Sequence, residues 1–112
     1  MISKPTRSRL KAAIDDPDSY CSGAKRKQLL VTYDKLLDEL SVKLFKEPCT
    51  NRMVFRQKVN ATSINSPVVR SLKNMLKNQD LLFSKDYRDH SDEIKTFLTN
   101  DLDHFLKALR DE

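Results

Sequence analysis

Residues 28–45 read Gln28-Leu-Leu-Val-Thr-Tyr-Asp-Lys-Leu-Leu-Asp-Glu-Leu-Ser-Val-Lys-Leu-Phe45, and this stretch decides the fold class. Its apolar residues recur at spacings of three and four: Leu29, Leu30, Tyr33, Leu36, Leu37, Leu40, Leu44 and Phe45. That period is typical of an amphipathic α-helix with a wide buried face. Because Ser22-Gly23 precedes the pattern and Pro48 follows it, the sequence predicts a long helix over about 24–46.

Four shorter helices are predicted on either side of this one. They cover about 5–14, 51–60, 67–78 and 94–109. Thr50 is the expected N-cap of the second of these, and Ser66-Pro67 combines a capping hydroxyl with proline at the first helical position. Ser91-Asp92-Glu93 is expected to cap the last helix and to place acids at its positive end. The apolar run Leu81–Phe83 has no helical period.

The amino-acid composition limits the possible fold classes and the expected cellular compartment. The chain has 112 residues and one glycine, so tight hairpins, P-loops and Rossmann phosphate loops are excluded. We therefore expect one all-α domain over 1–112, a compact bundle of about five helices with a helix-turn-helix-like core as a variant, and loose ends at 1–4 and 111–112. No apolar run suits a membrane span or a signal peptide, which favours an intracellular protein, cytoplasmic or nuclear.

Catalysis and metal binding lack a sequence signal. Cys21 and Cys49 show no CxxC spacing, and His90 and His104 are far from both in the sequence. A zinc site normally has paired ligands at short spacing, and a nucleophile needs a nearby base and an orienting group. We expect a protein that is not an enzyme, with two free thiols, no metal, no cofactor, no small-molecule substrate and no membrane partner.

Positive charge is unevenly distributed along the chain. Residues 1–80 carry sixteen Lys/Arg against eight Asp/Glu, a balance of +8, whereas 81–112 carry five against eight, a balance of −3. Basic helix faces bind phosphate backbones by releasing counterions. The residues expected to contact nucleic acid are Arg56, Lys58, Arg70, Lys73, Lys77, Lys25, Arg26 and Lys27. The competing interpretation is that these side chains only solvate the surface or contact a protein.

Two short segments resemble families that act in transcription. Residues 65–82 resemble the second half of a helix-turn-helix, and Asp80-Leu81-Leu82 stands where winged-helix repressors of the MarR and SarA type have Gly-Leu-Ile. That resemblance implies a wing and return strand over Asp92-Glu93 and Phe97–Thr99.

The second resemblance is to the helical N-terminal domain of transcription elongation factors of the TFIIS class. Thr62-x-Ile64 followed by Val68 is similar to that family's Thr-x-Ile-Gly-x-x-Val pattern, with Asn65 in place of the glycine and Phe105 in place of a tryptophan. It implies binding of short disordered peptides of partner proteins.

The leading hypothesis is a small regulatory module that binds DNA or RNA and takes part in transcription. The alternative is a helical adaptor or inhibitor that docks on a protein partner through an apolar groove. Convergence of the eight basic residues on one surface would favour the first, and an apolar groove as the largest surface feature would favour the second.

Overall fold

The computed structural model describes residues 2–110, and within this range every regular element is helical. The elements are α1 (Lys4–Asp15), η1 (Pro17–Tyr20), α2 (Gly23–Phe45), α3 (Arg52–Ala61), α4 (Pro67–Asn78), η2 (Gln79–Phe83), α5 (Ser91–Thr96), η3 (Phe97–Leu102) and α6 (Asp103–Arg110). Since α5, η3 and α6 follow one another without a break, residues 2–110 form five principal helices. The prediction of an all-α bundle is confirmed.

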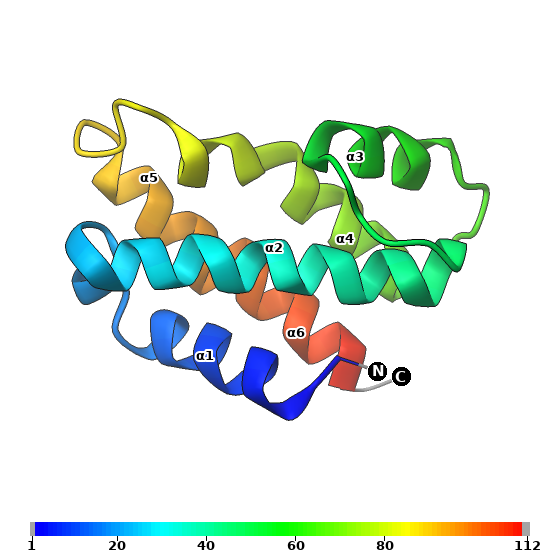
Figure 1. Cartoon of the computed structure of the whole chain (residues 1–112), viewed down its shortest axis with the longest axis horizontal. Coiled ribbons are helices and arrows are strands. Elements are labelled where there is room, and N and C mark those ends of the chain that lie inside the picture. Colours follow the sequence, from blue (N-terminus) through cyan, green and yellow to red (C-terminus); the bar gives the residue numbers. More distant parts are fainter. Residues whose placement is uncertain (1, 111–112) are drawn as a thin grey trace.

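The first two helices form an antiparallel pair, with α1 below α2 in Figure 1. The backbone N–H of Ser3 donates to Glu39 Oε1 at 2.5 Å, and the hydroxyl of Thr6 donates to Glu39 Oε2 at 2.6 Å. Burial alone would raise the pKa of Glu39, but these hydrogen bonds outweigh it and lower the pKa. Ser3 and Lys4, which were expected to be loose, therefore cap and begin α1; Met1 and residues 111–112 lie outside the described residues.

The caps of α3 and α4 test two sequence predictions. The hydroxyl of Ser66 accepts the backbone N–H of Val69 at 3.2 Å, as predicted for the start of α4. The prediction of Thr50 as the cap of α3 is wrong: Asn51 takes that place, because its side-chain oxygen accepts from both Met53 and Val54. Two orphan donors at the helix start are thereby satisfied by one side chain.

The last helix is continuous but changes its winding. Residues 97–102 form a π-helical segment between α5 and α6, which shifts the phase of the helix face relative to its neighbours. Asp101, in this segment, accepts from Asn74 at 3.0 Å and from Asn78 at 2.9 Å. The wing implied by the first resemblance is wrong, since Asp92, Glu93 and 97–99 are all helical. Ser91 is the first helical residue and does not cap this helix, because the N-cap position is taken by His90.

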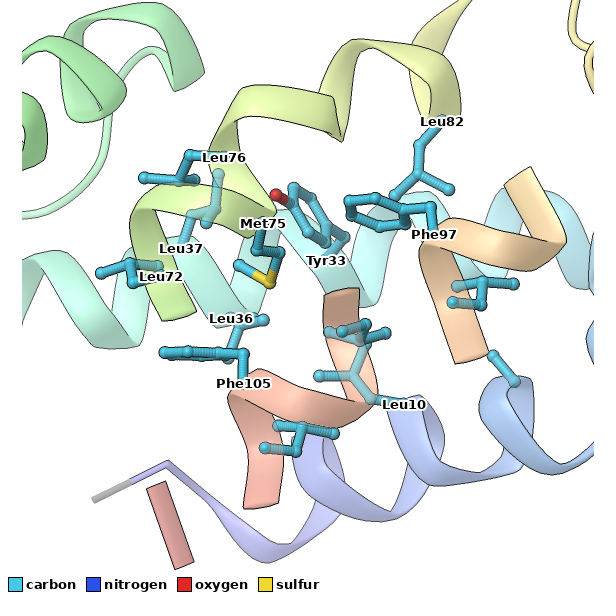
Figure 2. Packing of buried hydrophobic residues seen from close by; sticks show 14 of the residues in the cluster. Leu10, Tyr33, Leu36, Leu37, Leu72, Met75, Leu76, Leu82, Phe97 and Phe105 are labelled. Carbon is cyan, nitrogen blue, oxygen red and sulfur yellow. The ribbon is translucent and has the colours of Figure 1, made fainter. Parts of the chain in front are cut away.

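The core lies between α2, α4 and the last helix, and α1 covers it from one side (Figure 2). Figure 2 shows Tyr33 of α2 beside Met75 of α4 and Phe97 of the last helix. The hydroxyl of Tyr33 donates to the side-chain oxygen of Gln79 at 2.7 Å, so this buried polar pair is satisfied. Burial raises the pKa of Tyr33 well above its usual range, and the group stays a neutral donor.

Candidate nucleic-acid interface

An open cleft of about 400 Å³, lined by basic and amide residues, lies between α3 and α4. From α3 come Arg56 and Asn60, four residues apart; from α4 come Lys73, Asn74 and Lys77. Residues three or four apart share one helix face, and the two faces meet because the helices pack against each other. Three cations and two amides thus converge on one concave surface.

Apolar packing on the opposite sides of α3 and α4 fixes the orientation of the helix faces that line the cleft. The inner side of α3 is buried at Phe55 and Val59. The inner side of α4 is buried at Val69, Leu72 and Leu76. Two of the cleft residues are also tied individually. Lys73 Nζ donates to the carbonyl oxygen of Thr62 at 3.4 Å, and the Asn74 amide is held by Asp101. The cleft is therefore partly ordered before any ligand arrives.

The cleft has an excess of positive charge. None of its five described lining residues is Asp or Glu. The nearest carboxylate in an ion pair is Asp80, whose Oδ2 lies 3.8 Å from Arg56 Nη1, and the Asp80 side chain is 73% exposed. A long, solvated pair of this kind contributes little energy. An incoming anion can therefore replace Asp80 at Arg56 at small cost.

Two of the predicted residues near this cleft do not line it. Arg70 is exposed on α4 and lies on the same helix face as Lys73 and Lys77, one turn closer to the N-terminus. Lys58 is two positions from Arg56, which places the two side chains about 200° apart around the helix. Lys58 accordingly forms an ion pair with Glu47 and lies over the ring of Phe45, away from the cleft.

The Lys25–Lys27 cluster lies at the start of α2, at the opposite end of the long axis from α3 (Figure 1). Arg26 donates to the carbonyl oxygens of Leu82 at 2.8 Å and Ser84 at 3.5 Å, and its guanidinium stacks on Tyr87. Lys25 lies over the ring of Tyr20, and Lys27 lines a groove between α1 and α2. The eight predicted residues therefore do not converge on one surface. The convergence expected of a nucleic-acid-binding module holds only for Arg56, Lys73 and Lys77, which line the cleft.

The charge pattern of the sequence does not indicate the two amides of the cleft. Asn60 is four residues after Arg56, and Asn74 is three residues before Lys77. Their helical spacing from the basic residues was visible in the sequence. Because an asparagine adds no charge, a search based on charge alone passed over both.

Among residues 2–110, no three His, Cys, Asp or Glu side chains are placed to hold a metal ion together. Cys21 and Cys49 are free thiols, and burial raises the pKa of both. Within the same range, no helix combines the length and apolar character needed to cross a membrane.

No protein-family model, curated protein or solved structure matches this chain. Its function is therefore inferred from the geometry of its own residues.

Proposed function

We propose that this protein is a non-enzymatic regulatory module that binds nucleic acid through the cleft between α3 and α4. The observation that carries the proposal is the convergence of Arg56, Lys73 and Lys77 from two helices on one concave surface. Cations that are concentrated in a hollow repel one another. Solvation of a helix exterior does not require this arrangement. A phosphate in the hollow removes that repulsion.

The lining chemistry suits a phosphodiester backbone. The guanidinium of Arg56 can donate two parallel hydrogen bonds to one phosphate, and the two lysines act as point charges. Asn60 adds a neutral donor of the kind that contacts phosphate and sugar oxygens, and Asn74 adds the amide hydrogen that it does not donate to Asp101. Displacement of counterions from the backbone by the three cations supplies the binding free energy.

The cleft favours a duplex over a single strand. Proteins that hold single strands stack bases on aromatic side chains, and none of the five described lining residues is aromatic. Arg70 lies one turn beyond the cleft on the same face of α4, in place to contact a neighbouring phosphate. Contacts limited to phosphates position a protein without reading bases, so we expect weak sequence preference.

The test is a salt titration of a charge-neutralised cleft. The triple variant R56Q/K73Q/K77Q removes three charges and leaves polar, somewhat shorter side chains in their place. Each phosphate contact contributes about 0.9 to the slope of log affinity against log salt. The slope should flatten by about 2–3, and affinity for a mixed-sequence duplex at 0.15 M salt should fall about 100-fold.

The matched control removes the same number of charges elsewhere. Lys35, Lys43 and Lys85 are exposed and lie outside the cleft. Their triple Gln variant should keep the wild-type salt slope to within about one unit. Equal losses in the two triple variants would mean that only net charge matters, and absence of duplex binding by the wild type would refute the proposal outright.

A further inference from the structure

A second hollow lies between α1 and α2, and its character differs from that of the α3–α4 cleft. It is a groove of about 620 Å³. Its lining comes from α1, from η1 and from the first half of α2: Ser8, Arg9, Ala12, Tyr20, Lys27, Gln28, Leu29, Val31 and Thr32. Because α1 and α2 run antiparallel, the groove between them is a trough that follows the helices.

The middle of this trough is apolar. Val31 is 61% exposed, the highest value among the large hydrophobic side chains of the described residues. Ala12 of α1 is also exposed, whereas Leu29 is buried and forms the floor. An apolar side chain left this accessible gains free energy when a partner covers it.

The edges of the trough are cationic. Arg9 lines it from α1 and Lys27 from α2, and neither forms an ion pair with another described residue. No Asp or Glu is among the described residues that line the groove. An occupant should therefore be apolar along its centre and negative at its edges.

A phosphate backbone does not meet this description, because aliphatic side chains such as Val31 and Ala12 offer it no donors. An amphipathic helix does, when it presents a leucine-like stripe bordered by Asp or Glu. Such a helix lies along a groove between two helices and contacts it through residues spaced i, i+3, i+4 and i+7. Opposite charges at the edges then fix its orientation and accelerate its association.

We propose that the α1–α2 groove docks an acidic amphipathic helix of a partner protein. The groove shares no lining residue with the α3–α4 cleft, and α1 and α3 lie on opposite sides of α2 (Figure 1). Both sites can be occupied at once. The protein would then hold an acidic partner next to a nucleic acid, which neither site achieves alone.

The probe is a synthetic helix of about 18 residues, roughly 27 Å long. It carries Leu at i, i+3, i+4 and i+7, and Glu on both sides of this stripe. A matched peptide has Lys at every Glu position, and binding is measured by fluorescence anisotropy. The 112-residue chain should bind the acidic peptide at least about tenfold more tightly than the basic peptide.

The chain offers a matched pair of valines for the apolar contact. Val31 lies in the groove, and Val42 lies on the same helix with 49% exposure but outside it. V31E should weaken binding of the acidic peptide at least about tenfold, whereas V42E should leave it unchanged. Equal effects of the two variants would overturn the proposal, as would failure of the acidic peptide to bind.

Charge reversal tests the edges independently. The double variant R9E/K27E should prefer the basic peptide, and K43E/K85E should keep the wild-type preference. Duplex DNA at saturating concentration should not displace the acidic peptide. Displacement, or loss of duplex binding in R9E/K27E as large as in the cleft variant, would instead assign the groove to nucleic acid and overturn the docking proposal.

Discussion

Two basic clusters of the described residues contain three cations each, yet the fold engages their side chains differently. At the start of α2, the guanidinium of Arg26 fits between the carbonyl oxygens of Leu82 and Ser84 and the ring of Tyr87. Between α3 and α4, Arg56, Lys73 and Lys77 surround an open hollow. In the first cluster the central cation links two distant parts of the fold, and in the second the cations make only long, weak contacts within the protein.

The structural role of a basic cluster therefore depends on which acceptors its side chains reach, and its charge alone does not reveal that role. Carbonyl oxygens at the end of a 3₁₀ segment lack helical partners and need donors from elsewhere. Arg26 supplies them at Leu82 and Ser84. The cations of the cleft have only one backbone acceptor among them, Thr62 with Lys73, and one distant carboxylate, Asp80 with Arg56.

The largest expected effect concerns stability at Arg26. R26A removes hydrogen bonds from a charged donor to two carbonyl oxygens and a stacking contact, so unfolding free energy should fall by about 2–3 kcal/mol. K25A and K27A should each change it by less than about 0.5 kcal/mol. Urea unfolding measures all three. If R26A behaves like K25A, the contrast between the two clusters is wrong.

The next effect concerns binding and compares two lysines on the α3–α4 pair. K77Q removes one phosphate contact, so duplex affinity at 0.15 M salt should fall about fivefold and the salt slope by about 0.9. Lys58 is held by Glu47 on the opposite face of α3, and K58Q should change affinity by less than about twofold. A loss in K58Q as large as in K77Q would show that the cleft does not define the interface.

Some features of the fold are predictable from the sequence, and others are not. The stripe on residues 28–45 and the Ser66-Pro67 start were readable because helix period and capping are local properties. The choice of Asn51 over Thr50 as a cap was not, because either side chain can cap and the backbone path from α2 decides. The π-helical turn at 97–102 depends on packing of the last helix against its neighbours, which no local pattern encodes.

The same distinction between local sequence patterns and long-range packing applies to the candidate site. Lys73 and Lys77 were predictable together, since they are four residues apart on one helix. Their meeting with Arg56 required the packing of α3 on α4. The structural use of Arg26 could not be predicted, because its acceptors lie 56 and 58 residues further along the chain.

A smaller effect should come from the carboxylate that forms an ion pair with a cation of the cleft. Asp80 is the ion-pair partner of Arg56, and it competes with a phosphate for the same guanidinium. D80N should therefore tighten duplex binding by about 1.5–5-fold, the range that a surface ion pair of about 0.2–1 kcal/mol allows. Weaker binding in D80N would mean that Asp80 orients Arg56 and does not compete with the ligand.

The smallest expected effect is a pH dependence of stability, and it comes from the end of the molecule near Arg26. His90 precedes α5, and its Nδ1 lies 3.0 Å from Glu93 Oε1. The hydrogen bond to Glu93 raises the pKa of His90 above its usual value of 6.5. Stability from this pair is fully present below pH 6.5 and is lost as pH rises through the raised pKa, because the unfolded chain loses the proton first.

The measurement is the melting temperature of wild type and E93Q across that range. E93Q should lower the melting temperature more at pH 5.5 than at pH 8.5, and the difference should vanish in an H90Q background, which has no titrating ring. The loss of an acid from the first turn of α5 affects both pH values alike, so the comparison isolates the histidine. Duplex binding should not follow this titration, since no histidine or carboxylate lines the cleft among the described residues. A duplex affinity that falls with the deprotonation of His90 would instead couple the two ends of the molecule and remove the contrast between them.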